Sequence, residues 1–555
     1  STSTTPWTWS KLGTRAAMKT HEGRRGTPFA LLAMALLSLP RGADGGAAAD
    51  TPGARASPPD MGSSHSGTSQ APHQANCGHV FILNTDIRHL ACDAWLLPVS
   101  RAMEVDRVWN VSPNDLPYRP RGWGTTALAV ACREKDEQGR RRRVEERFRT
   151  YEHPVPILTD VLSNPADGKK SLDELLAALR QFLELAKDEA LAKPSRFGRA
   201  LPLIAVPIFG AGLASDELLQ ADVGHLGETI LAVLEELRAF SQKYPLDIAL
   251  CTIDGAAFGA ALNARRKQFP GFVNRAPAFV RNPEGWRDEV NRLSGLCLSG
   301  HLSLFLGAGV SINAGLPSWP QLLEQIAFTV GFDELAIARM RALDPLEAAT
   351  VCAARAGGES ALKEVVSRII GRVKRHSLQH ALLSGLPFKG AITTNYDELF
   401  EQAVRCAGGD IAVLPAQIGG VRDMWLLKMH GTVRRPGSIV LTRADYSRFS
   451  KEQAASEGVL QGLLLTQHVL FVGFGMRDEN WCRISASVTG ATWGNSNSGG
   501  NGNSNGSGRD IARTHHNANS HSHTQNALAI SGGNANAHTQ GGSSSISGGG
   551  GGGNR

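Results

Sequence analysis

The chain lacks the cysteine spacings that hold structural metals or disulfide frameworks. Its eight cysteines are spread over 555 residues, with no CxxC pair and no clustered Cys/His spacing. Zinc sites and disulfide scaffolds both need cysteines at such characteristic spacings. The sequence therefore predicts neither a zinc site nor a disulfide framework.

An excess of one sign of charge is also missing. The sequence has 58 Lys and Arg against 51 Asp and Glu, and the small basic excess is scattered along the chain. A nucleic-acid-binding protein concentrates its cations on one face or stripe. The most basic run, residues 134–149, mixes both signs and reads as a solvated face. No nucleic-acid partner is expected.

Long apolar runs and heptad repeats are absent too. Basic residues and then roughly eleven apolar residues follow Met18, a pattern close to a signal-peptide core and too short to span a bilayer. Two interpretations stay open, a secretory or organellar targeting segment and an unstructured start, so the compartment is not predicted and no stable membrane span is expected. Without heptads no coiled coil is indicated, and a homo-oligomer is left open.

The chain has the apolar residues and the length for several hydrophobic cores. Hydrophobic residues make up 42% of the chain, and its length suits more than one domain. Composition divides it into a targeting-like, disordered segment at 1–76, an α/β domain at 77–270, a linker at 271–285, a second α/β domain at 286–489 and a disordered Gly/Ser/Asn/His-rich tail at 490–555.

The first folded stretch alternates apolar strand-like runs with amphipathic helical patterns. The helix after Ser171 begins with a capping box completed by Glu174. Such alternation predicts a layered, mostly parallel α/β domain.

The second folded stretch contains "FLGAGVSINAGLPSW", residues 305–319. A buried strand is followed by Gly307, Ala308 and Gly309, and small polar residues then precede a helix expected to begin near Trp319. Glycines in such a turn let a diphosphate approach backbone amides, and the helix N-terminus favours negative charge. A simple tight turn explains this block equally well when it is taken alone.

Three later blocks place further polar groups after strands. Thr394, Asn395 and Asp397 follow one apolar run, and His430 follows another. The carboxyl ends of parallel strands are where open α/β sheets bind ligands. Each block has a plainer interpretation as a helix cap or a buried histidine. The third block is "LFVGFGMRDEN", with Gly473, Phe474, Gly475 and Asp478.

Taken in order, these blocks resemble the SIR2-like branch of the sirtuin superfamily. The resemblance implies a Rossmann-like domain that takes NAD as substrate, with a helical insertion between the first two blocks. By position it assigns catalytic roles to His430, Asn395 and Asp397, and NAD binding to Gly307, Ala308, Gly309, Ser311, Thr394, Gly473, Phe474, Gly475 and Asp478.

Two departures from protein-deacylating sirtuins stand out. Ser318 and Trp319 replace their Asp-Phe-Arg element, and their four zinc-binding cysteines have no counterpart here. No zinc is therefore expected, and a cleft for acyl-lysine peptides is disfavoured. The sheet should also continue with at least one more strand after residue 487, yet low complexity begins almost at once, so a missing or degraded C-terminal edge is expected.

The first stretch resembles a macro domain, a three-layer α/β module that binds ADP-ribose. "NTDI", "CDAWLLPVS" and "PIFGAGL" carry the resemblance, which places Asp86 on the adenine side and Gly210, Ala211 and Gly212 beside the phosphates. "FGAG" as a mere strand-to-helix turn remains an alternative. The family's asparagine-rich loop is replaced by "LPVSRAMEV", so binding or sensing is implied rather than hydrolysis of ADP-ribose esters.

Three functions follow. The first is a hydrolase that cleaves NAD into nicotinamide and ADP-ribose, regulated by nucleotide binding to the macro-like domain. The second is an NAD-dependent protein deacylase or ADP-ribosyltransferase. The third is a non-catalytic ADP-ribose-binding protein. NAD and ADP-ribose-type nucleotides are the expected partners.

Overall fold

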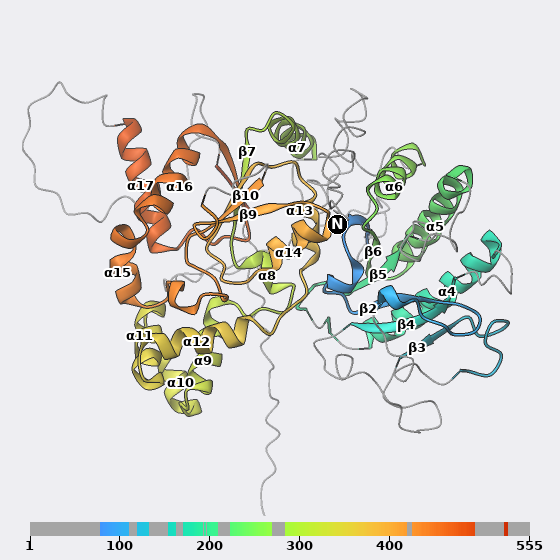
Figure 1. Cartoon of the computed structure of the whole chain (residues 1–555), viewed down its shortest axis with the longest axis horizontal. Coiled ribbons are helices and arrows are strands. Elements are labelled where there is room, and N and C mark those ends of the chain that lie inside the picture. Colours follow the sequence, from blue (N-terminus) through green and yellow to red (C-terminus); the bar gives the residue numbers. More distant parts are fainter. Residues whose placement is uncertain are drawn as a thin grey trace, which may run out of the picture.

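Two six-stranded sheets, one from each half of the chain, form the framework of the molecule (Figure 1). This computed structural model describes residues 78–109, 119–132, 154–162, 170–208 except 193 and 196, 223–268, 283–418, 424–493 and 527–530. The targeting-like segment at 1–76 and the predicted phosphate-binding residues Gly210, Ala211 and Gly212 lie outside the described residues.

The first sheet has the strand order β1-β6-β5-β2-β4-β3. Its pairings are parallel except that β3 runs antiparallel to β4. Its elements, in chain order, are β1 (Val80–Asn84), η1 (Ile87–His89), β2 (Ala94–Val99), η2 (Arg107–Trp109), β3 (Ala129–Ala131), β4 (Val155–Asp160), α4 (Leu172–Leu191), β5 (Leu203–Pro207), α5 (Val223–Lys243), β6 (Asp247–Thr252) and α6 (Gly255–Gln268).

Helices α4, α5 and α6 cover one face of this sheet (Figure 1). Helix α4 begins with the predicted capping box, in which the Ser171 hydroxyl accepts from the Glu174 N–H and the Glu174 carboxylate accepts from the Ser171 N–H. That reciprocal pair satisfies two amides that no helical carbonyl can reach. The predicted layered α/β architecture is confirmed.

The second sheet is parallel throughout, in the order β12-β11-β7-β8-β10-β9. Parallel strands need helical crossovers, and these supply the layers on its two faces. Its elements are α7 (Pro283–Leu298), β7 (Leu302–Leu306), α8 (Gly309–Ile312), α13 (Leu378–Ser384), β8 (Gly390–Thr393), α14 (Leu399–Cys406), β9 (Ile411–Leu414), β10 (Met424–Lys428), η4 (Pro436–Ser438), α15 (Arg443–Glu452), α16 (Ala454–Thr466), β11 (His468–Val472), α17 (Glu479–Trp493) and β12 (Ala527–Ile530).

The outer edge of this sheet is filled by strand β12, which lies inside the tail for which disorder was predicted. Its four residues pair in parallel with β11, from Val469 opposite Ala527 to Val472 opposite Ile530. A short apolar run in a polar tail can satisfy the N–H and C=O groups that an edge strand leaves unpaired. The expected missing edge is therefore occupied, by a segment that composition alone assigned to the tail.

A helical insertion lies between β7 and β8, as predicted, and its helices pack in one buried cluster with residues of the sheet domain. The insertion consists of α9 (Trp319–Thr329), α10 (Glu334–Met340), α11 (Pro345–Ala356) and α12 (Glu359–Ile370), and α9 begins at the expected Trp319. A buried ion pair, Lys363 Nζ to Asp445 Oδ1 at 2.7 Å, joins α12 to α15. Burial alone would raise the pKa of the Asp445 carboxyl. Hydrogen bonds from Lys363 and from two backbone amides outweigh burial and hold that pKa below its usual value.

One of the buried hydrophobic clusters contains residues of both halves. In β1, Val80 and Ile82 face α4 to α6, whereas Phe81 and Leu83 belong to a cluster that continues into the second half through α7, α13 and α14. A backbone bridge pairs Leu90 with His376, beside α13. The face of the first sheet that its own helices leave open is thus covered partly by the second half.

Candidate functional site

The predicted glycine turn lies where the strand order of the second sheet reverses. From β7 the chain moves to neighbouring β8, and it later returns from β10 to β11 on the other side of β7. The carboxyl ends of β7 and β11 therefore flank a topological switch point, the usual ligand-binding position in an open parallel sheet.

The glycines at this point allow two loops to touch. A Cβ on Gly307 would lie 2.4 Å from the carbonyl oxygen of Gly473, and one on Gly309 would lie 2.7 Å from the Gly473 Cα. Gly473 itself has a φ of 64°, in the left-handed region. Loop-to-loop packing thus explains these three glycines, whereas a Cβ on exposed Gly475 would meet nothing within 4 Å and leaves room for a ligand.

The carboxamide of Asn395 is fixed by the neighbouring turn. Its Nδ2 donates to the carbonyl oxygen of Gly307 at 3.0 Å and to Ser311 Oγ at 3.2 Å. Its backbone N–H donates to Thr393 Oγ1, whose hydroxyl donates to the carbonyl oxygen of Leu306. Since both amide hydrogens are used, Oδ1 is the end that Asn395 can present to a ligand or a water.

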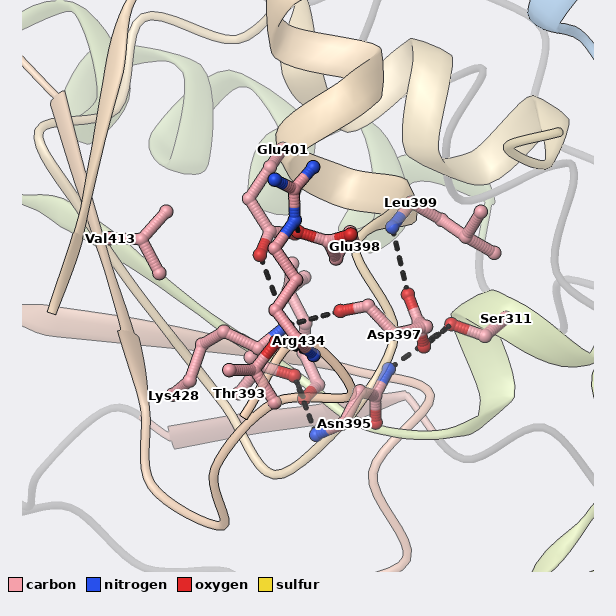
Figure 2. A network of polar contacts seen from close by, with 12 residues as sticks. Ser311, Thr393, Asn395, Asp397, Glu398, Leu399, Glu401, Val413, Lys428 and Arg434 are labelled. Atoms are coloured by element: carbon pink, nitrogen blue, oxygen red, sulfur yellow. Dashed lines mark hydrogen bonds and ion pairs between the residues drawn. The ribbon is translucent and has the colours of Figure 1, made fainter. Parts of the chain in front are cut away.

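Asp397 is buried and its two carboxylate oxygens are both occupied (Figure 2). Oδ2 accepts from Ser311 Oγ at 2.9 Å, and Oδ1 accepts from the Leu399 N–H at 3.0 Å at the start of α14. The plainer interpretation of Asp397 as a helix cap therefore holds, and the same contacts fix its negative charge beside Asn395. Ser311 joins the two residues.

A buried ion pair that the sequence analysis missed lies beneath these residues. Lys428, the last residue of β10, contacts the carbonyl oxygen of Asp397 and lies 3.0 Å from Glu401 Oε1 (Figure 2). Burial raises the pKa of the Glu401 carboxyl, and the Lys428 cation opposes that rise. A lysine at the end of an apolar strand was the available signal.

His380 is a second residue that the sequence analysis missed. It lies on α13, with Nδ1 accepting from the Ser377 N–H at 3.2 Å and Nε2 at 3.4 Å from Ser311 Oγ. Burial lowers the pKa of His380 to about 4, although the Asp397 charge acts in the opposite direction, so the ring is neutral near pH 7. Ser311 accepts from Asn395, donates to Asp397 and lies beside His380.

His430 follows β10 by two residues, in the turn after the strand that pairs with β8. The ring is 3% exposed, and burial lowers the pKa of His430, with the Asp478 charge opposing that shift. A neutral imidazole at this edge can accept a proton near pH 7.

The other predicted NAD-site residues lie around the same edge in different settings. Ala308 is exposed at the start of α8, and Thr394 is half-buried after β8. Phe474 is buried, with its ring 4.4 Å from that of Phe305, so its side chain packs in the core and only its backbone faces the turn. Asp478 lies beside His430, 3.7 Å from Nε2.

In the first half, the Asp86 carboxylate is already engaged. It caps η1 by accepting from the Arg88 N–H, and it pairs with the Arg88 guanidinium at 2.6 Å. The net effect lowers the pKa of Asp86, with the arginine outweighing the opposing effect of burial. Its neighbour Thr85 contacts His376 Nε2 of the second half at 2.9 Å. The end of β1 thus lies against the second half.

Membrane-spanning and metal-binding features are absent from the part of the chain that the structure describes. Within those residues, no helix combines the length and apolarity needed to cross a bilayer. No group of three or more His, Cys, Asp or Glu side chains is arranged there to hold a metal ion.

A parallel sheet with glycine turns at its switch point and polar side chains along its carboxyl edge is the arrangement typical of nucleotide-binding α/β domains. Comparison with protein families narrows the class. Residues 389–492 match the SIR2-like domain family, and the chain therefore carries a SIR2-like domain, as the motifs predicted. This range contains Asn395, Asp397, His430 and the turn at 473–475.

Proteins of similar sequence include NAD(+) hydrolases and a sirtuin. The chain is 31% identical over 206 residues to the NAD(+) hydrolase ThsA of Enterococcus faecium, covering 36% of this chain and 42% of the relative. It is 31% identical over 194 residues to ThsA of Bacillus cereus, covering 34% and 40%. It is 24% identical over 191 residues to Defense-associated sirtuin 2 of Bacillus subtilis, covering 33% and 18%. The matched region spans about two fifths of the two ThsA proteins.

Proposed function

We propose that this protein hydrolyses NAD to nicotinamide and ADP-ribose. The observation that carries the proposal is the contact between Asn395 and the Gly307 turn, with Ser311 linking Asn395 to Asp397. This contact brings the expected diphosphate turn and the expected nicotinamide side to one edge of one sheet. The names of the ThsA relatives support the same reaction.

The reaction breaks the bond between ribose C1′ and the nicotinamide nitrogen. The bonding electrons leave with neutral nicotinamide, and positive charge develops on the ribose, as in glycoside hydrolysis. A water oxygen then bonds to C1′ and loses a proton. The balance is NAD and water giving nicotinamide, ADP-ribose and one proton.

The fixed charges at the site suit this course. The Asp397 carboxylate, held by Ser311 and the Leu399 N–H, provides negative charge that does not need to reorganise as the ribose becomes positive. Asn395 offers Oδ1 to the substrate carboxamide or to the attacking water. Neutral His430 accepts the proton.

The test is to incubate the full chain with NAD alone and to measure nicotinamide. Release without any peptide supports hydrolysis, whereas release only with an acyl-lysine peptide would indicate a deacylase, and none at all would indicate a binding protein. His430→Ala should lower turnover by about 10²- to 10⁴-fold, the contribution of a general base. His301→Ala is the matched control, because His301 is exposed and precedes β7 at the opposite edge of the sheet.

We also propose that the first half binds ADP-ribose-type nucleotides and that this binding regulates hydrolysis. The contact from Thr85 to His376 supports a connection, since the neighbouring Ser377 hydroxyl lies 2.8 Å from the carbonyl oxygen of Val310, the residue before Ser311 in α8. The test is calorimetry with ADP-ribose, followed by NAD turnover with and without it. Binding that leaves turnover unchanged in the wild type would refute regulation but not binding.

A further inference from the structure

We propose that Asp478 and Tyr446 are positioning residues for His430: together they hold the imidazole in place and balance the positive charge it gains on accepting a proton. This inference rests on the proposed hydrolysis. It gives Asp478 a role other than direct contact with the dinucleotide.

Three elements bring side chains to the imidazole. Tyr446 on α15 lies edge-on to the ring, with centroids 5.4 Å apart, and Phe449 on the same helix lies at 5.8 Å. Asp478 Oδ2, from the loop after β11, is 3.7 Å from Nε2. Asn480 on α17 brings its Nδ2 to 3.5 Å from the same nitrogen.

The two oxygens of Asp478 have separate partners. Oδ1 accepts from the Trp481 N–H at 2.9 Å and so caps α17, which accounts for the plainer interpretation of this residue. Oδ2 accepts from the Tyr446 hydroxyl at 2.6 Å. The cap and the tyrosine thus aim the carboxylate, and the oxygen that no cap requires is the one beside His430.

An arginine holds the two supporting helices together. Arg443, the first residue of α15, lies 2.7 Å and 2.8 Å from the two carboxylate oxygens of Glu479, the first residue of α17. The same arginine reaches Asp344 at the start of α11. Both contacts come from Nη1, and they join the helix that carries Tyr446 to the helix that Asp478 caps.

The anionic group that faces His430 favours protonation of its ring, and the titratable tyrosines nearby stay neutral. Asp478 is the anion that faces the ring, and Tyr446 remains a neutral phenol because burial and the Asp478 charge raise its pKa. Tyr396, further along the same edge, also stays neutral, because burial and the charges of Asp478 and Asp445 raise its pKa. Asp478 therefore favours the imidazolium, against the burial that disfavours it.

The kinetic experiment compares Asp478→Asn and Tyr446→Phe with the wild-type full chain, using NAD over a range of pH. Asparagine keeps the cap on α17, so the variant retains its fold. We expect Asp478→Asn to lower kcat by about 10- to 100-fold, part of what a general base contributes, with little change in KM. In this variant the acid limb of the curve of kcat against pH moves to lower pH, because the Asp478 charge that raises the pKa of His430 is gone. Tyr446→Phe changes kcat in the same direction by less.

Asp333→Asn is the matched control, since Asp333 is an exposed cap of α10 that asparagine can replace. A higher KM with unchanged kcat in Asp478→Asn would mean that Asp478 contacts the dinucleotide, and it would overturn the proposal. Unchanged kinetics would overturn it as well.

A second measurement does not depend on turnover. The His430 ring is titrated by NMR in the wild type and in Asp478→Asn, with His430→Gln used to assign its signals. A lower pKa in the variant supports the pairing, and an equal pKa overturns it. If the wild type releases no nicotinamide, hydrolysis fails while this titration still decides whether Asp478 and His430 are paired.

Discussion

Asn395 Nδ2 lies 3.0 Å from the carbonyl oxygen of Gly307. One hydrogen bond thus joins the turn after β7 to the turn after β8, and it fixes which end of the Asn395 carboxamide faces outward.

Asn395→Asp should disturb the site more than its size suggests. The new oxygen would replace an N–H and face the Gly307 carbonyl and Ser311, so two acceptors would meet without a proton between them. We expect a loss of about 1 to 3 kcal/mol in the free energy of unfolding, and a fall in turnover of about 10²- to 10³-fold, as for a lost preorganised polar contact. Urea unfolding and nicotinamide release measure the two effects. Equal stability of Asn395→Asp and Asn395→Ala would contradict the assigned amide orientation.

Gly473 and Gly475 should respond differently to alanine. A Cβ on Gly473 would lie 2.6 Å from the Val310 nitrogen, and the backbone there has a positive φ. Gly473→Ala should therefore lower the free energy of unfolding by about 1 to 3 kcal/mol, the range for a strained backbone. Gly475→Ala should leave the melting temperature unchanged and raise the KM for NAD. An unchanged KM would indicate that the substrate does not lie against Gly475.

NAD hydrolysis should persist to a lower pH than in an enzyme whose general base is a histidine with an ordinary pKa. Burial lowers the pKa of His430, and the neutral ring is the form that accepts a proton. As the pH falls from 7.5, kcat should hold its plateau through about 6.5, the ordinary pKa of histidine, and decline below it. The measurement is kcat against pH at saturating NAD. A midpoint above the ordinary value would mean that the Asp478 charge outweighs burial.

The folded protein should lose stability in mild acid because of His376 and His380. Burial lowers their pKa values to about 3 and about 4, so between those values and about 6.5 the unfolded chain binds protons that the folded chain does not. Stability is thus complete above about 6.5 and falls by about 1.4 kcal/mol per pH unit for each histidine below it. His376→Gln should remove about half of that slope in urea unfolding followed from pH 6.5 to 4.5. An unchanged slope would assign the effect to other groups.

The two halves should unfold together. Phe81 and Leu83 of the first sheet lie in the same buried cluster as Leu382 of α13, so separation would expose apolar surface on both halves. Calorimetry of the full chain should show one cooperative transition, and a fragment covering residues 283–493 should aggregate. Two well-separated transitions with a soluble fragment would show that the shared cluster contributes little.

The sequence by itself determined the strands that end at the candidate site and their order along the chain. Apolar runs ending in small or polar residues predicted β7, β8, β10 and β11, because strand ends and glycine turns are local features of the chain. The capping box at Ser171 and the start of α9 at Trp319 are local in the same sense. The motifs also identified the SIR2-like domain.

Tertiary structure alone decided what these residues touch. His380 and Ser311 are 69 positions apart, and Tyr446 and Asp478 are 32 apart, so no local pattern could pair them. Strand β12 finds its place only because β11 offers an unpaired edge, and the shared cluster exists only once two sheets fold against each other. Hydrogen bonds and apolar contacts between distant segments depend on how the sheets pack, and periodicity along one segment carries no record of that packing.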